Sequence, residues 1–104
     1  MKKHYFLGIT KTDRACILKS LAPFDALDPA DVEKDDFTHV STDWGGGGSI
    51  EHTLKCLQDR MGRTPKLTGR EITLRKPISY SGVDYDWGHA LNWTFEVVKI
   101  AEVE

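Results

Sequence analysis

The sequence predicts an α+β fold in which a mostly antiparallel sheet of four or five strands is packed on one face by two or three helices. Three observations lead to this class. Helical signals lie in the first two thirds of the chain, strand-like segments fill the last third, and no internal repeat is present. A chain of 104 residues is expected to bury one hydrophobic core, so residues 1–104 are interpreted as a single compact domain.

The chain is expected to begin with a strand and a helix. Residues 4–9 are an apolar run in which Phe6 adds an apolar side chain on the second face, as is typical of a central strand. A helix is then expected from a cap at Thr12 or Asp13 to about Leu21, because apolar residues recur along one stripe. The stripe consists of Ala15, Ile17, Leu18 and Leu21.

A second, shorter helix is expected in residues 27–35. Asp28 can cap it, and Pro29 fits the first helical position, where a missing N–H costs nothing. Acidic residues follow closely, which limits this helix to about two turns. Residues 37–42 are rich in β-branched and aromatic types and predict a strand.

The clearest helical signal follows a run of glycines. Apolar residues recur there at helical spacing, with Ser49 as the N-cap and Gly62 as the C-terminal stop. The recurring residues are Ile50, Leu54, Leu57 and Met61. This segment is expected to form an amphipathic helix that buries one face.

The last third predicts strands. Residues 70–76 alternate between apolar and polar types, residues 78–87 look like two short strands around Ser81-Gly82, and a turn at Gly88-His89 leads into a strand over 91–100. The inward-facing set of that last strand is expected to be Leu91, Trp93, Phe95 and Val97, followed by Val98 and Ile100 in the opposite phase. This change of phase predicts a β-bulge near Val97.

Composition limits the classes of function. Fourteen Lys and Arg against sixteen Asp and Glu give a formal net charge of −2, which disfavours a nucleic-acid partner. No apolar run approaches the roughly 20 residues that span a bilayer, and the N-terminus lacks a signal peptide's apolar stretch, so no membrane association and a cytoplasmic location are expected. Cys16 and Cys56 lack metal-ligand spacing, so they are expected to be free thiols, and no metal or cofactor is expected.

A glycine loop precedes the amphipathic helix and has three open interpretations. Unpaired N–H groups at a helix N-terminus can hold a phosphate, and glycines allow its close approach. The loop has no P-loop or dinucleotide-binding pattern, so it could equally be a natural tether without a ligand. It also matches the unit of engineered flexible linkers. The loop residues are Gly45, Gly46, Gly47, Gly48 and Ser49.

A second candidate region is the aromatic and polar segment around the last predicted turn. Tyr85 and Trp87 could anchor a ligand or partner, and Asp86 with His89 could exchange protons. Trp44, beside the glycine loop, is a third aromatic candidate. Turn chemistry, a solvated strand face and core packing explain the same residues without a function.

These observations favour a small binding or inhibitory protein that occupies the surface of a partner protein, as accessory proteins of phages and mobile elements often do. The alternative is a binder of a phosphate-bearing ligand such as a nucleotide, held by the glycine loop and stacked on an aromatic ring. A hydrolase using His89 and Asp86 is a weaker third hypothesis, so no enzyme is expected. A homo-oligomer remains open, as does a role for acidic residues 25–36 and basic residues 60–76.

Overall fold

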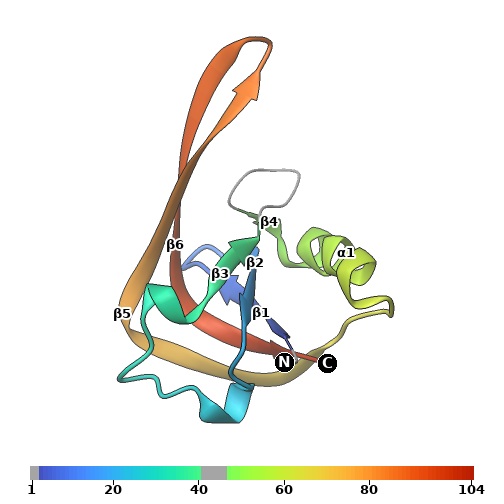
Figure 1. The fold of residues 1–104 in the computed structure, drawn as a ribbon, viewed down its shortest axis with the longest axis vertical. Helices are drawn as coiled ribbons and strands as arrows, with labels where there is room; N and C mark the ends of the chain where they lie inside the picture. Colours follow the sequence, from blue (N-terminus) through green and yellow to red (C-terminus); the bar gives the residue numbers. More distant parts are fainter. Residues whose placement is uncertain (1–2, 41–46) are drawn as a thin grey trace.

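A computed structural model of the protein describes residues 3–40 and 47–104, which form an antiparallel sheet and one α-helix (Figure 1). The strands are β1 (His4–Ile9), β2 (Arg14–Ser20), β3 (Thr38–Val40), β4 (Gly48–Ser49), β5 (Leu67–Asp86) and β6 (His89–Val103), and the helix is α1 (Ile50–Met61). The sheet order is β3-β2-β1-β6-β5, and β4 pairs with β2. The α+β class therefore holds loosely. The expected counts are wrong, because the described residues contain six strands and a single α-helix.

Strand β1 is central, as its sequence predicts. It pairs with β2 on one side and with β6 on the other. Phe6 belongs to the core on one face of the sheet, while Leu7 and Ile9 belong to the core on the other face. The sheet is thus buried on both faces near its centre.

Burial on both faces also explains why the expected helix up to Leu21 is wrong. Residues 14–20 form β2, and four consecutive side chains of this strand are buried completely. They are Ala15, Cys16, Ile17 and Leu18. A strand covered on both faces reads as a continuous apolar run, and such a run cannot be separated from a buried helix by periodicity alone.

Different parts of the chain cover the two faces of the sheet. Leu57 of α1 packs against Leu7 and Ile17 on one face. On the other face, Phe24 and Phe37 pack around Phe6, with ring centroids 6.2 and 6.1 Å from its ring. The second cover comes from the segment between β2 and β3 and from the curled hairpin of β5 and β6, not from a helix.

The helix expected in residues 27–35 is also wrong. The carbonyl of Asp28 accepts from the N–H groups of Asp31 and Val32, and the Asp28 carboxylate accepts from the N–H of Ala30. The capping signal thus forms one turn, but only 3-10 turns at Phe24–Ala26 and Lys34–Asp36 flank it. Leu27 and Val32 are the apolar residues that reach the core there, which is too little burial to support a longer helix.

Helix α1 confirms its prediction in detail. The Ser49 hydroxyl accepts from the N–H of His52 at 3.1 Å, and Gly62 ends the helix with a φ of 70°. Leu57 is fully buried, whereas the other predicted stripe residues are partly buried. Thr53 is also fully buried, and its hydroxyl donates to the carbonyl oxygens of Ala15 and Ser49.

Residues 67–86 form one continuous strand, so the two short strands expected around Ser81-Gly82 are wrong. Gly82 is not a turn residue; it pairs with Trp93 across the hairpin. A Cβ atom at this glycine would lie 2.4 Å from the Trp93 ring, so the indole occupies the space above the strand. The glycine serves cross-strand packing, which a single sequence does not distinguish from a turn.

The predicted bulge is confirmed in position but lies on the other strand. Thr73 pairs with Lys99 and Ile78 pairs with Val97, so the register shifts between these pairs. Four residues of β5, 74–77, face the single residue Val98. The buried side chains of β6 change phase at this point, from Phe95 and Val97 to Ile100, as the sequence predicts.

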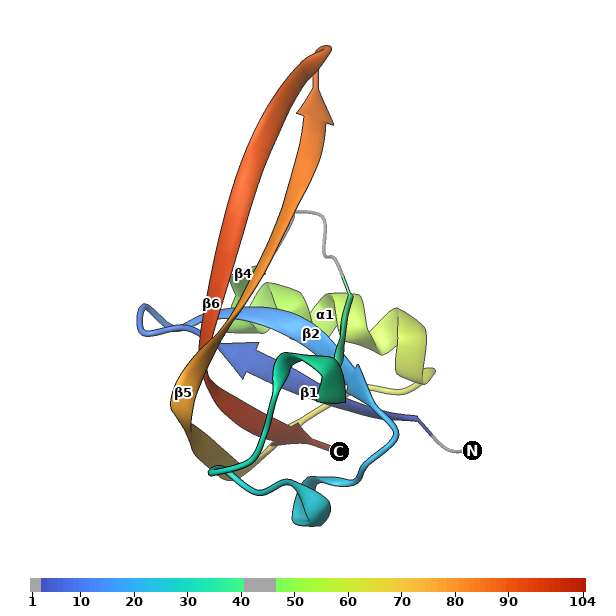
Figure 2. The same cartoon turned by 60° about the vertical axis from the view of Figure 1, so that its left-hand side comes forward.

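The far part of this hairpin projects from the rest of the molecule, as two views 60° apart show (Figures 1 and 2). We call residues 81–94 the arm. Below it, Tyr80 and Phe95 are 5% and 6% exposed and belong to the core. The arm is a two-stranded ribbon, because within it β5 and β6 pair only with each other among the described residues.

Candidate functional site

The tip of the arm is a two-residue turn formed by Trp87 and Gly88. Their φ angles are 52° and 80°, and Asp86 and His89 pair on either side. Two consecutive positive φ angles define the turn type that joins twisted strands best, which favours Asn-Gly or Asp-Gly. The expected turn at Gly88-His89 is thus displaced by one residue.

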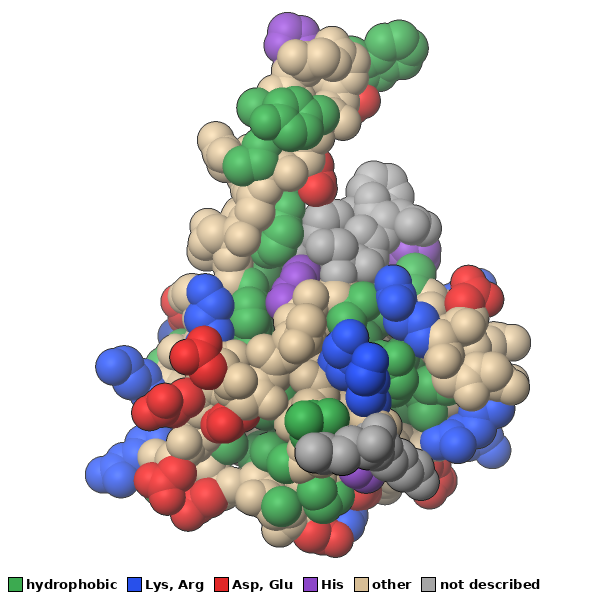
Figure 3. All heavy atoms as spheres, in the orientation of Figure 1, with side chains coloured by type: hydrophobic (Ala, Val, Ile, Leu, Met, Phe, Trp, Pro, Cys, Tyr) green, Lys and Arg blue, Asp and Glu red, His purple; other side chains and the backbone are tan. Residues whose placement is uncertain are grey.

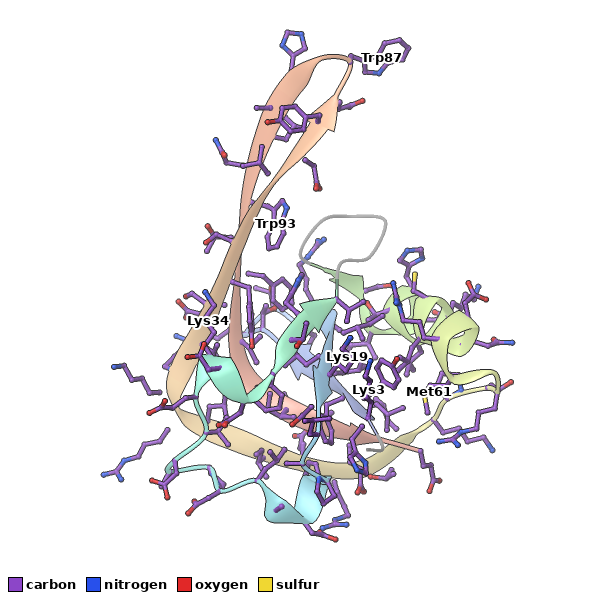
Figure 4. All side chains as sticks on the ribbon, viewed as in Figure 1. Lys3, Lys19, Lys34, Met61, Trp87 and Trp93 are labelled. Carbon is purple, nitrogen blue, oxygen red and sulfur yellow. The ribbon has the colours of Figure 1, made fainter. Side chains whose placement is uncertain are left out.

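Trp87 is the most exposed large hydrophobic side chain in the described part of the molecule, at 93%. It points away from the end of the arm (Figure 4). A tryptophan in the left-handed region is unusual, because Asn, Asp and Gly tolerate that conformation far better. Trp87 therefore combines an unfavourable backbone conformation with almost no burial.

Other apolar side chains are exposed along the arm (Figure 3). The described residues include six exposed large hydrophobic side chains, and four of these belong to the arm: Val83, Tyr85, Trp87 and Leu91. Leu91 is 51% exposed, so its expected inward orientation is wrong. An apolar concentration of this kind marks an interaction surface more often than scattered single residues do.

The strand register divides the arm into two faces. Tyr85 pairs with Ala90 and Val83 pairs with Asn92, so these pairs share one face. The other face carries Asp84 opposite Leu91 and Asp86 opposite His89. Val83 and Tyr85 therefore lie on the face opposite the two aspartates. Every residue from Val83 to Asn92 is exposed, so both faces of the outer part of the arm are open to solvent.

The arm has an acidic and aromatic character. Asp84 and Asp86 are its charged residues, and it contains no Lys or Arg. Asp86 and His89 are brought together as strand partners, yet both are exposed. The hydrolase hypothesis needs these groups inside a hollow. None of the three described surface hollows includes an arm residue.

The largest of these hollows has a volume of about 570 Å³ and lies on the body of the protein. Lys3 and Lys19 contribute amines to it, and Asp35 and Asp36 contribute carboxylates. The charges of its lining therefore balance, which gives no preference for an anionic ligand.

A stack of aromatic rings holds the base of the arm. The ring of His39 lies 5.1 Å from that of Tyr80 and 5.3 Å from that of Trp93. Trp93 is partly buried, not fully in the core, and it lies over Gly82. The Tyr80 hydroxyl and the Trp93 ring N–H are buried without a hydrogen-bond partner in the described structure, and burial raises the pKa of Tyr80.

The glycine loop is described only at its end. Trp44, Gly45 and Gly46 lie outside the described residues, while Gly47 and Gly48 are buried. A Cβ atom at Gly47 would meet the Ala15 carbonyl oxygen and the Phe95 ring, both at 2.4 Å. Glycine at this position is thus explained by packing.

The structure does not bring this end of the loop to the arm tip. Gly47 approaches Phe95, whose strand partner is Tyr80. Tyr80 lies seven residues before Trp87, which is about 23 Å of extended strand. The Ser49 hydroxyl is already used as the helix cap. The described residues of the glycine loop and those of the arm tip therefore do not line a common hollow.

The two thiols are free, and the described residues contain no group of three or more side chains suited to hold a metal ion. The Cys56 sulfur lies 3.5 Å from the His52 ring nitrogen, as their helical spacing predicts. Burial raises the pKa of the Cys16 thiol from 9.0 to about 12, so this thiol stays protonated and unreactive at neutral pH.

Comparison of the chain with protein-family models, with curated proteins and with solved structures gave no match. In the described ranges, no helix has both the length and the apolar character that crossing a membrane requires.

Sequence reasoning identified the aromatic members of the arm but missed Leu91 as an exposed residue. Its alternation with Trp93 and Phe95 is regular, so apolar periodicity alone places all three in the core. The signal that could have indicated the exposure of Leu91 is the position of Asp84 and Asp86, which lie opposite the outer part of β6. Charged partners on the same face indicate that this part of the hairpin lies beyond the core.

Proposed function

We propose that this chain is a protein-binding module and that the arm tip, centred on Trp87, docks on the surface of a partner protein. Where that surface is the partner's own functional cleft, docking inhibits the partner. The observation that supports this proposal is the combination at Trp87 of a φ of 52° with 93% exposure.

The energetic argument is that Trp87 does not serve the fold. Holding a non-glycine residue in the left-handed region costs on the order of 1 kcal/mol or more. Burial would offset this cost, but the side chain is almost fully exposed. Asn at this position would give a more stable turn. A large aromatic in such a place gains its stabilisation when a partner buries it.

The chemistry of the surrounding residues fits a protein partner. Tryptophan and tyrosine are enriched among the residues that dominate binding energy, and Tyr85 lies two residues before Trp87. The two carboxylates of the arm favour a cleft with Lys or Arg at its rim. The same charges disfavour docking on nucleic-acid phosphate.

We also place the module in the cytoplasm. Both cysteines are free, and free thiols persist in a reducing compartment. Fractionation of cells that produce the full chain tests this location.

The test compares three immobilised proteins in the same cell extract. They are the wild type, Trp87→Asn, and Leu21→Asn as a matched control. Leu21 is also an exposed apolar residue, at 58%, but it lies outside the arm. Bound proteins are quantified by mass spectrometry, and any candidate is then purified and its affinity measured.

The expected result is a partner that the wild type and Leu21→Asn both retain and that Trp87→Asn loses by at least about tenfold, or roughly 1.4 kcal/mol, as hot-spot truncations do. Trp87→Asn should unfold at the same or a higher denaturant concentration than the wild type. The proposal is wrong if no bound protein depends on Trp87, or if Trp87→Asn destabilises the fold.

A further inference from the structure

We propose that two copies of the chain associate through the open edge of β6 in the arm. The contact segment is His89–Phe95, and the two β6 strands would pair antiparallel about a two-fold axis to form a continuous four-stranded sheet. The inference goes beyond the proposed function, because it concerns the strand edge and a second copy of the chain.

The edge is open because β6 is longer than its neighbour on that side. β1 pairs with β6 only between Lys99 and Glu102. From His89 to Phe95, the one described partner of β6 is β5, which occupies the opposite edge. The backbone groups on the outer edge therefore have no strand partner among the described residues. Such an edge is a template for another strand.

This edge lacks the usual protection against pairing. Residues 89–95 contain no Lys, Arg, Asp, Glu or Pro, and the register with β5 is regular throughout them. The outer edge of β5 differs, because Asp84 and Asp86 lie within its arm segment. Pairing two β5 edges would bring these carboxylates close to their copies, and like charges in facing strands are destabilising. This difference in charge favours pairing of two copies through β6 rather than through β5.

The side chains of the β6 edge suit a symmetric contact centred on Leu91. Leu91 is half exposed and would face its own copy across the axis. Residues at equal distances on either side pair with each other, so His89 would face Trp93 of the second copy on the same sheet face. Aliphatic and aromatic pairs of this kind stabilise neighbouring strands.

A second ribbon completes the arm in such a dimer. A two-stranded ribbon is marginally stable alone, and a second ribbon beside it supplies the missing strands. Antiparallel arms place the Trp87 tip of each copy beside the base of the other arm, where the two indoles can bury about 300–500 Å² in all. Leu91 and the newly paired backbone add to this area, while Val83 and Tyr85 on β5 lie outside the contact.

One consequence concerns regulation. A dimer of this kind withholds Trp87 from other proteins, so self-association and partner binding exclude each other. The dimer is then a resting form, and the monomer presents the tip.

Sedimentation velocity and light scattering on the full chain over a wide range of concentration test the dimer. The variants are Leu91→Lys and Asn92→Lys on β6, with Val83→Lys on β5 as the matched control. Val83 and Leu91 are aliphatic and similarly exposed, at 46% and 51%, and they lie on opposite edges of the ribbon. Circular dichroism confirms that each variant is folded.

We expect the wild type and Val83→Lys to reach twice the 11.7 kDa of one chain, and both β6 variants to remain at 11.7 kDa. The inference is overturned if the wild type stays monomeric, if Val83→Lys is also monomeric, or if assemblies grow beyond two copies. None of these measurements uses a partner protein. If self-association follows this pattern and no captured protein depends on Trp87, the proposed function fails while the dimer stands.

Discussion

At the scale of single residues, glycine has two distinct uses in this chain. Gly47 and Gly82 lie where another atom occupies the place of a Cβ. Gly88 has open space around that place, but its φ of 80° favours glycine. The first use concerns packing and the second concerns backbone conformation. Only the second leaves a clear mark in the sequence, as a glycine inside a turn.

Replacing Gly47 by Ala should lower the free energy of unfolding by about 1–3 kcal/mol, because the new methyl group overpacks the site against Ala15 and Phe95. Urea unfolding measures the loss. Gly69→Ala is the contrasting case, because its site is open and its φ of 88° alone causes a loss of roughly 1–2 kcal/mol. If Gly47→Ala is silent, the segment is a tether and the packing described for it is incorrect.

At the scale of elements, local signals succeed where a segment is covered on one side. Helix α1 has a cap, a stop and one buried face, so its pattern is unambiguous. Strand β2 is buried on both faces, and its continuous apolar run imitates a helix. The hairpin of β5 and β6 misleads in the opposite way. Apolar and polar residues continue to alternate along the arm, although this part of the hairpin lies beyond the core.

The arm should be separable from the body. Deleting Val83-Asp84 together with their strand partners Leu91-Asn92 shortens it by two pairs and preserves the alternation and the turn. The free energy of unfolding should change by less than about 0.5 kcal/mol, because the deleted residues are all exposed. Chemical denaturation measures this change. A large loss of stability would mean that the arm supports the core.

At the scale of the whole molecule, the stability of the body rests on two cores that share one sheet. The core on the face away from α1 contains two groups that ionise only at high pH, Cys16 and Tyr80. Burial raises the pKa of both. Neither group can ionise in place without placing a charge in an apolar environment, which couples the fold to alkaline pH.

We expect stability to fall as the pH rises above about 9, because the unfolded chain loses the Cys16 proton near the ordinary value of 9.0 while the folded chain keeps it to about 12. The contribution of the protonated thiol is therefore complete below pH 9 and disappears toward pH 12. Urea unfolding at pH 7 and at about pH 10.5 measures the difference.

Cys16→Ala should show a smaller fall between the two pH values, although a small cavity lowers its stability at pH 7. Cys56→Ala should show the same fall as the wild type, since Cys16 is still present. Equal falls in Cys16→Ala and the wild type would contradict the assignment to this thiol.

The sequence by itself determined the elements whose signals are local. The central strand β1, the capped helix α1 and a turn close to Trp87 follow from neighbouring residues. So does the concentration of aromatic candidates near residues 85–89. Backbone capping, turn chemistry and apolar periodicity act within a few residues, so a single chain displays them.

Tertiary structure alone decided which faces are covered and how far the core extends. It made residues 14–20 a strand, because a second core lies on the far side of the sheet. It made β5 and β6 extend beyond the end of their neighbour β1, which leaves Leu91 exposed and one edge of β6 without a strand partner among the described residues. Burial depends on contacts between residues far apart in the chain, and no local pattern reports where those contacts end.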